Sequence, residues 1–423
     1  MILFTQGRYV YQIQIMNQDL TIQEVEELYQ NLKSKGFQLD LARGKPSSEQ
    51  LDLSNDLDTS LSGEYIHEGV DTRNYGELLG LDSIRRLGSE ILGCQKEMVI
   101  AGGNSSLTLM AHYLSSLYFQ GSGEGPWSMN ERNSFLCPVP GFDRHFKLCE
   151  EFSINMIPVS LTGKGPDIKQ IKSIIESDSS VRGIWCVPKH SNPTGETYNT
   201  ECIEGLLEII GSKEEFRILW DNAYAVHDFK DSEELPNIFS LAEKKGLINS
   251  VIAFGSTSKI TYAGSGIGFI AMSENNLNRF VKHYSSVAIN PNKVNQAKHV
   301  NFFQDFIDLK SHMKKHADIV RPKFQIVQKW LSKQNYGSWT KPTGGYFVSF
   351  NCEPGLAKKV VGLANLAGLK LTPAGSTFPY GVDPNDENIR LAPTACTIKE
   401  LEQAMELFII CVAFATLKKK ASS

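Results

Sequence analysis

Residues 251–264 read VIAFGSTSKITYAG, an apolar run of strand length followed at once by small residues and one lysine, Lys259. No aspartate or glutamate lies within ten positions of Lys259 on either side, although a surface lysine normally stands among charged neighbours. From this stretch alone two explanations are open. Lys259 is either a solvated loop charge or a nucleophile whose lowered pKa lets it form an imine with an aldehyde.

The same arrangement recurs along the chain, because short apolar runs alternate with longer helical patterns between about residues 80 and 275. The runs are MVIA (98–101), SFLCPVP (134–140), INMIPVS (154–160), GIWCVP (183–188), FRILWD (216–221), VIAFG (251–255) and GFIAM (268–272). Strands separated by helices predict an α/β fold with a mostly parallel sheet sandwiched by helices. Ligands of such sheets bind beyond the carboxyl ends of the strands, so the residues that follow each run are the site candidates.

The pattern changes after about residue 305. It predicts a helix from Asn301 to about Lys333, a strand at GGYFVSF (344–350), a helix from about Leu356, the segment NIRLAP (388–393) and a final helix from Ile398. Because chain termini often lie close together, we expect residues 16–62 and 310–423 to form a smaller α+β domain and residues 63–309 the large one. Residues 1–15 precede the first helical pattern and are expected to be a dispensable extension.

Composition excludes several classes of protein. The formal net charge of the 423 residues is -4, which argues against a general affinity for nucleic acid or acidic membranes. The eight cysteines form no C-x-x-C pair, which favours reduced thiols in a cytoplasmic protein over a disulfide framework or a zinc site. The apolar stretch FIICVAFATL before Lys418 is too short to span a bilayer, so we expect a packed terminal helix there.

Glycines and small polar residues follow the run MVIA and open the next helical pattern. Backbone N–H groups at a helix start, aided by the helix dipole, bind a phosphate well. The residues of such a cradle would be Gly103, Asn104 and Ser105. An ordinary capped helix is the alternative explanation of this segment.

Other runs are followed by side chains that suit a flat ring. Phe142 could stack on a ring, and Asn192, in the turn NPTG, could point its amide at a ligand. Asp221 ends a strand that should be buried and needs a cationic or hydrogen-bonded partner, while Tyr224 could share its ligand. Taken singly, Phe142 is better explained as a core aromatic and Asn192 as part of a plain turn, while Asp221 is explained as well by a helix N-cap. Taken together with Lys259, they suit a phosphorylated pyridine aldehyde, in which a protonated ring nitrogen makes the ring an electron sink.

The order GGNSS, PGF, NPTG, DNAY and STSK, completed by GGYF and NIRLAPT, resembles the fold-type I pyridoxal-phosphate aminotransferases of class I/II from about residue 20 onward. The segments LARGKPSSEQLDLS, DTRNYGELLGLDSIR, STSKITYAGSG and PNKVNQAKH are similar to a bacterial aspartate aminotransferase subgroup related to the aminotransferase half of certain regulators. The resemblance implies pyridoxal 5'-phosphate as cofactor and a small amino acid and a keto acid as substrates. The expected reaction converts aspartate and 2-oxoglutarate to oxaloacetate and glutamate by a ping-pong mechanism through an imine on Lys259.

The resemblance also implies a role for each matching residue. Lys259 would be the Schiff-base lysine and general acid/base, and Asp221 would pair with the ring nitrogen. The remaining cofactor contacts would come from Asn192 and Tyr224 at the ring oxygen, Phe142 on the ring face, and Gly103, Asn104, Ser105 and Ser256 at the phosphate.

For the substrate, the resemblance implies that Arg390 binds the α-carboxylate, with the backbone of Gly44 nearby, and that Asn192 also contacts the substrate. Tyr75 would reach the phosphate of the neighbouring subunit, which implies a homodimer with shared active sites. The family pattern is broken at Ile267, where many relatives carry a phosphate-binding arginine.

The residue that binds a side-chain carboxylate is not fixed by these motifs. Arg144, Lys293 and Arg321 are unranked candidates. The pair His312 and His316 is spaced for one helix face, and without a third ligand we expect a solvated face and no metal site. A lyase or decarboxylase that uses the same cofactor remains an alternative. A non-catalytic cofactor-sensing module is a further one, although no basic helix-turn-helix is visible.

Overall fold

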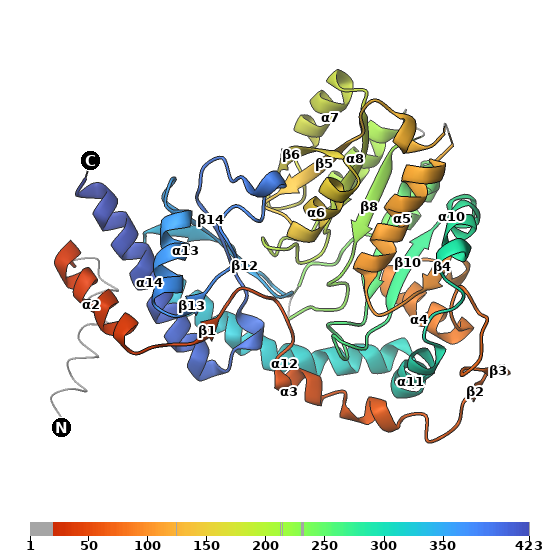
Figure 1. The fold of residues 1–423 in the computed structure, drawn as a ribbon, viewed down its shortest axis with the longest axis horizontal. Helices are drawn as coiled ribbons and strands as arrows, with labels where there is room; N and C mark the ends of the chain where they lie inside the picture. The colour runs from red at the N-terminus through yellow and green to blue at the C-terminus, as the bar shows by residue number, and fades with distance from the viewer. Residues whose placement is uncertain (1–19, 124, 212, 214, 230–231, 423) are drawn as a thin grey trace.

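The computed structural model describes residues 20–123, 125–211, 213, 215–229 and 232–422, so the expected extension at residues 1–15 lies outside the described residues. Figure 1 shows two packed bodies joined along the long helix α12 (Phe306–Leu331). Helix α2 (Ile22–Ser34) and helix α14 (Ile398–Lys420) lie side by side in the smaller body. Early and late parts of the chain therefore meet in one place.

The larger body is built on one seven-stranded sheet. Its strands are β4 (Val99–Ala101), β5 (Ser134–Val139), β6 (Asn155–Ser160), β7 (Val181–Cys186), β8 (Arg217–Asp221), β9 (Val251–Ser256) and β10 (Gly268–Met272). Their order is β4-β10-β9-β8-β7-β5-β6, and only β10 runs antiparallel to its neighbours. Each of the seven apolar runs is a strand, which confirms the predicted α/β fold with a mostly parallel mixed sheet.

Helices cover both faces of this sheet. One face packs against α5 (Ser106–Gln120), α6 (Asp143–Glu151) and α10 (Glu274–Val287), and the other against α4 (Asp82–Leu92), α7 (Ile168–Ser177), α8 (Thr200–Ile210) and α9 (Ile238–Lys244). Within β9, Ile252 and Phe254 point to the first face, whereas Val251 and Ala253 point to the second. Burial on both faces explains why the strands read as continuous apolar runs rather than alternating ones.

The smaller body contains two short sheets. Strands β11 (Gly337–Trp339), β12 (Val348–Cys352) and β14 (Asn388–Leu391) are antiparallel, and β1 (Leu39–Asp40) pairs in parallel with β13 (Leu369–Lys370). Helices α13 (Ala357–Leu366) and α14 pack on them, and Tyr29 of α2 stacks on Phe414 of α14 at 5.4 Å. The domain boundaries near residues 62 and 309 stay a prediction.

The remaining helices, strands and turns complete the fold of the described residues. They are α3 (Ser48–Asp52), β2 (Ile66–His67), β3 (Val70–Asp71), α11 (Lys293–Phe303) and the 3₁₀ turns at Asn55–Thr59, Lys96–Met98, Trp127–Met129, Ile248–Ser250, Pro379–Gly381 and Pro393–Ala395. Helix α14 begins at Ile398 as predicted, and its stretch FIICVAFATL is largely buried. Among the described residues no helix has the length and apolar character needed to cross a membrane.

The prediction of one continuous helix from Asn301 to Lys333 is wrong. Helix α11 ends at Phe303, and α12 begins at Phe306 after Gln304 adopts a positive φ of 51°. The side chain of Asp305 accepts hydrogen bonds from the backbone N–H groups of Ile307 and Asp308 at 2.8 and 2.9 Å. Asp305 therefore caps a new helix, which an apolar pattern running through both helices conceals.

Candidate active site

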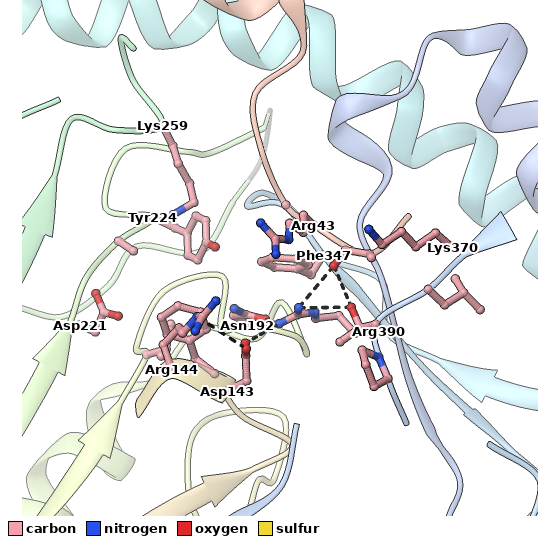
Figure 2. A pocket seen from close by; sticks show the side chains of 18 of the residues that line it. Arg43, Asp143, Arg144, Asn192, Asp221, Tyr224, Lys259, Phe347, Lys370 and Arg390 are labelled. Carbon is pink, nitrogen blue, oxygen red and sulfur yellow. Dashed lines mark hydrogen bonds and ion pairs between the residues drawn. The ribbon is translucent and has the colours of Figure 1, made fainter. Parts of the chain in front are cut away.

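A cavity of about 590 Å³ lies between the carboxyl edge of the seven-stranded sheet and the smaller body (Figure 2). The sequence-predicted residues that line it are Gly44, Phe142, Asn192, Asp221, Tyr224, Lys259 and Arg390, together with the candidate Arg144. These residues come from both bodies of the chain. Of the residues predicted to cluster at one edge of the sheet, Phe142, Asn192, Asp221, Tyr224 and Lys259 line this cavity, whereas the predicted phosphate cradle does not.

Lys259 lies in a tight turn directly after β9. The carbonyl of Thr257 accepts hydrogen bonds from the N–H groups of Ile260 and Thr261 at 2.8 and 2.9 Å, which turns the chain so that Lys259 enters the cavity. Its Nζ lies 5.1 Å from the centre of the Tyr224 ring (Figure 2). Burial lowers the pKa of Lys259, and the negative charge of Asp221 offsets part of that effect. These surroundings do not fit a solvated loop lysine.

The backbone carbonyl of Lys259 is also held in place. It accepts hydrogen bonds from Tyr346 Oη and from His227 Nε2, both at 3.3 Å. Gln50 of α3 in turn donates to Tyr346 Oη at 2.9 Å. The position of the lysine backbone therefore depends on segments from several parts of the chain.

Asp221 is the last residue of β8 and is 4% exposed. Its Oδ2 accepts a hydrogen bond from His145 Nε2 at 3.0 Å, and the His145 ring stacks on Trp185 with ring centres 4.1 Å apart. The other oxygen, Oδ1, is buried without a hydrogen-bond partner. No helix begins at Asp221, so the N-cap explanation is wrong. A buried carboxylate oxygen without a partner is costly, and a cationic ring N–H would satisfy it.

Arg390 of β14 reaches the cavity from the smaller body. Its Nη1 lies 3.3 Å from both Asn192 Oδ1 and Asp143 Oδ1, and its Nη2 donates to the carbonyl of Ala42 at 3.4 Å and to Thr372 Oγ1 at 3.2 Å. Nε is buried without a partner. The guanidinium is therefore fixed by several weak contacts and retains capacity for a carboxylate.

A glycine is required at position 44 because the Phe347 ring lies directly against its backbone. A Cβ at this position would overlap the Cζ atom of Phe347. The Phe347 ring in turn lies under the guanidinium of Arg390, 4.9 Å from its Cζ to the ring centre (Figure 2). The absence of a side chain at Gly44 lets Phe347 support the arginine.

The residues predicted to bind the phosphate, Gly103, Asn104, Ser105 and Ser256, do not line the cavity. Ser258 Oγ donates to the carbonyl of Asn104 at 2.9 Å and is 2.6 Å from Ser256 Oγ, which brings the two predicted segments together. Gly103 accepts a hydrogen bond from Gly268 at 2.7 Å. Ser105 precedes α5 without capping it through its side chain. The first N–H groups of α5 and the serine hydroxyls therefore form a group suited to a phosphate.

Four other positions lie away from the cavity. Tyr75 is 79% exposed, and Ile267 is buried in the core. Lys293 is buried and donates from Nζ to the carbonyls of Asn74 and Gly76 at 2.6 and 2.8 Å, while Arg321 pairs with Asp318 on α12. Lys293 and Arg321 therefore do not line this cavity and are engaged elsewhere in the fold, and their role at the substrate side chain stays a prediction.

The expectation of a solvated face at His312 and His316 is wrong, because both side chains are buried. His312 donates from Nε2 to the carbonyl of Ile260 at 2.8 Å, and Gln50 donates to His316 Nδ1 at 3.1 Å. The part of the chain that the structure describes contains no group of three or more histidines, cysteines or carboxylates arranged for a metal ion. The two histidines instead pack under the turn that carries Lys259.

Sequence reasoning missed several residues of the site. His145 follows Phe142 by three positions on one helical turn, a spacing that could have indicated it. Arg43 directly precedes Gly44 in the motif RGKP and could have been found in the same way. No local signal indicates Lys370, which lines the cavity because β13 pairs with β1.

The sequence and the fold are similar to those of known proteins. The family model described as aspartate amino-transferase matches residues 16–423. An aminotransferase of Mycolicibacterium smegmatis is 43% identical over 92% of this chain and 93% of its own, and the aspartate aminotransferase of Corynebacterium glutamicum is 40% identical over 95% and 94%. A solved aminotransferase structure from Corynebacterium diphtheriae has a TM-score of 0.91 at 45% identity, covering 94% of this chain and 100% of that one. The expected relation to regulators stays a prediction.

Proposed function

The chain belongs to the aspartate amino-transferase family, and from that membership we propose that it transfers the amino group of L-aspartate to 2-oxoglutarate with pyridoxal 5'-phosphate as cofactor. Its relatives over nearly the full length are aminotransferases, and so is this chain. The observation that carries the finer proposal is that Lys259, Asp221 and Arg390 line one cavity although they follow or belong to three different strands. That set supplies an amine, a buried carboxylate and a carboxylate-binding guanidinium at one place.

The residues present fit the cofactor. Asp221 Oδ1 is buried without a partner and suits a protonated ring nitrogen, while Asn192 and Tyr224 would contact the ring oxygen. Phe142 would cover one ring face, and the first turn of α5 with Ser256 would hold the phosphate. When bound, the cofactor supplies an electrophilic carbonyl and a ring that takes up the electron pair released at the substrate α-carbon.

Lys259 is proposed to move the proton. Its Nζ must be neutral to accept a proton from the substrate α-carbon, and burial favours the neutral form because it lowers the pKa of this lysine. The 5.1 Å contact with the Tyr224 ring keeps the side chain inside the cavity. A positioned general base of this kind typically contributes roughly 10²–10⁴ in rate.

Arg390 is proposed to orient the substrate. Its guanidinium would bind the α-carboxylate in place of the 3.3 Å contact that it now makes with Asp143. The rings of Phe347 and Tyr224 line the cavity and would limit water between a bound α-carboxylate and Lys259. Weaker screening in such a site strengthens each charged contact.

The protein is further proposed to form a homodimer in which each subunit contributes residues to the active site of the other. Tyr75 is strongly exposed, and Lys293 holds the neighbouring carbonyls of Asn74 and Gly76, so the loop presents the tyrosine outward. This arrangement supports a role in which Tyr75 reaches the phosphate of a second copy of the chain.

The test is to add L-aspartate and 2-oxoglutarate to the purified protein loaded with the cofactor. We expect the visible absorption band to shift when aspartate is added without 2-oxoglutarate. With both substrates present, oxaloacetate and glutamate should form in equal amounts. Lys259→Ala should abolish turnover, and unchanged steady-state transamination in that variant would refute the assignment. Release of carbon dioxide or ammonia in place of oxaloacetate would instead indicate a decarboxylase or a lyase. A protein that binds the cofactor and turns over no amino acid would be a sensing module.

A further inference from the structure

The cavity carries an excess of positive charge. Its cationic side chains are Arg43, Arg144, Lys259, Lys370 and Arg390, whereas its only carboxylates among the described residues are Asp143 and Asp221. Lys259, Asp221 and Arg390 are already assigned to the cofactor and the α-carboxylate. The remaining cations, Arg43, Arg144 and Lys370, are exposed to solvent at the cavity and give it its excess of positive charge.

Arg43 and Lys370 differ from Arg144 and Arg390 in lacking a polar partner. Within the described part of the chain neither side chain makes a hydrogen bond or an ion pair, although both line the cavity. Arg144, by contrast, has its Nε 4.0 Å from Asp143 Oδ2, and Asp143 also contacts Arg390. The two unpartnered cations are therefore available to an anionic group that enters the cavity.

The fold places these two cations next to the α-carboxylate site. Strand β13 pairs with β1, and Leu41 donates to the carbonyl of Lys370 at 2.9 Å. Arg390 Nη2 contacts the carbonyl of Ala42, the residue before Arg43, and the hydroxyl of Thr372, two residues after Lys370. Figure 2 shows Arg43 and Lys370 across the cavity from Asp221. The same two segments thus hold Arg390 and carry both cations.

We propose that Arg43 and Lys370 bind the side-chain carboxylate of a dicarboxylic substrate while Arg390 binds its α-carboxylate. The inference rests on the proposed function, in that the cavity must bind an amino acid. The planar guanidinium of Arg43 can donate two parallel hydrogen bonds to a carboxylate, and Lys370 adds a point charge. Both residues belong to the chain that supplies Lys259, so a subunit recognises the side chain of its own substrate.

The test compares aspartate with asparagine, which has nearly the same shape without the second charge. In the cofactor-loaded enzyme, Arg43→Gln with Lys370→Gln should lower kcat/KM for aspartate at least tenfold, mainly through KM, since hydrogen bonds to charged groups are worth roughly tenfold or more in affinity. The value for asparagine should stay within about threefold. Arg321→Gln is the matched control, because this half-buried arginine lies on α12 outside the cavity and pairs with Asp318.

A binding measurement separates this inference from the proposed function. Calorimetry with succinate should give an affinity at least tenfold weaker in the double variant than in the wild type, and the difference should shrink at high salt. Equal succinate affinity and an unchanged preference for aspartate over asparagine would overturn the inference, as would loss of that preference in Arg144→Gln alone. Absence of transamination in the wild type would instead overturn the proposed function, and succinate binding would still report on Arg43 and Lys370.

Discussion

His145 donates a hydrogen bond to one oxygen of Asp221 at 3.0 Å, while the other oxygen of the same carboxylate is buried without a partner. The imidazole cannot turn away, because it stacks on Trp185 at 4.1 Å with an angle of 8° between the rings. The histidine therefore fixes which oxygen of Asp221 is available to a ligand. It positions the carboxylate without itself lining the cavity.

Removing this positioning contact should slow catalysis. In His145→Ala we expect kcat to fall roughly tenfold or more, because an unfixed Asp221 carboxylate loses a charge-assisted hydrogen bond and the orientation that comes with it. Steady-state kinetics at saturating cofactor would measure the change. His112→Ala is the control, since His112 packs on Tyr284 away from the site. An unaltered kcat in His145→Ala would show that Asp221 is oriented by other means.

A methyl group at Gly44 should weaken substrate binding. Gly44→Ala forces the Phe347 ring to move, and that ring supports the guanidinium of Arg390. We expect KM for the amino acid to rise at least tenfold with a smaller change in kcat, because the carboxylate contact is made in both the ground state and the transition state. Gly362→Ala on α13 is the control, since a Cβ there meets no atom within 4 Å. A wild-type KM in Gly44→Ala would contradict the role given to Phe347.

Acid should destabilise the fold through buried histidines. Burial lowers the pKa of His227 to about 3, of His299 to about 4 and of His316 to about 3. In the unfolded chain each titrates near 6.5, so the unfolded state binds more protons below that pH and the free energy of unfolding decreases as the pH falls from about 6.5 toward 4. Each group contributes up to about 1.4 kcal/mol per pH unit in that window.

Urea unfolding at pH 7.5 and pH 5.0 would measure this loss of stability. His316→Gln removes one titrating group while keeping a side chain that can hydrogen-bond Gln50, so the dependence on pH should become shallower. The same pH dependence in the wild type and in His316→Gln would mean that His316 does not stay neutral in the folded protein.

Tyr75 should matter to the cofactor only in an assembled dimer. In size-exclusion chromatography we expect the protein to elute at about twice the chain mass of 47.1 kDa. We expect Tyr75→Phe to weaken cofactor binding severalfold, because it removes one hydroxyl hydrogen bond to the phosphate. Equilibrium titration of the cofactor would measure the change. Tyr65→Phe is the control in a nearby segment, because its ring contact with Arg73 does not need the hydroxyl. Normal cofactor affinity in Tyr75→Phe would remove the basis for a shared site.

The strands and the residues at their ends could be predicted from the sequence, because a strand buried on both faces is a continuous run of apolar residues. Asp221 and Lys259 are predicted for this reason, since Asp221 ends the apolar run that forms β8 and Lys259 lies in the turn that follows β9. The break at Gln304 was missed because apolar residues continue across it, and only the cap formed by Asp305 separates the two helices.

Other parts of the site depend on contacts that no local pattern records. The buried rings of His316 and His312 contact Gln50 and Ser54, respectively, which belong to a much earlier segment of the chain. Lys370 reaches the cavity only because β13 pairs with β1. These positions follow from tertiary structure, and a single sequence gives no periodicity or spacing that would reveal them.

The pairing of β1 with β13 also limits the order in which parts of the chain can fold during synthesis on the ribosome. Thr372 donates to the carbonyl of Ala42 across a separation of 330 residues, whereas the strands of the seven-stranded sheet all emerge before β13 does. The sheet can therefore fold during synthesis, while β1 and Arg43 wait for the last part of the chain, since contacts of long sequence separation form slowly. Lys259 and Asp221 are synthesised before Arg390. A nascent chain therefore cannot bind the substrate α-carboxylate until Arg390 has been added.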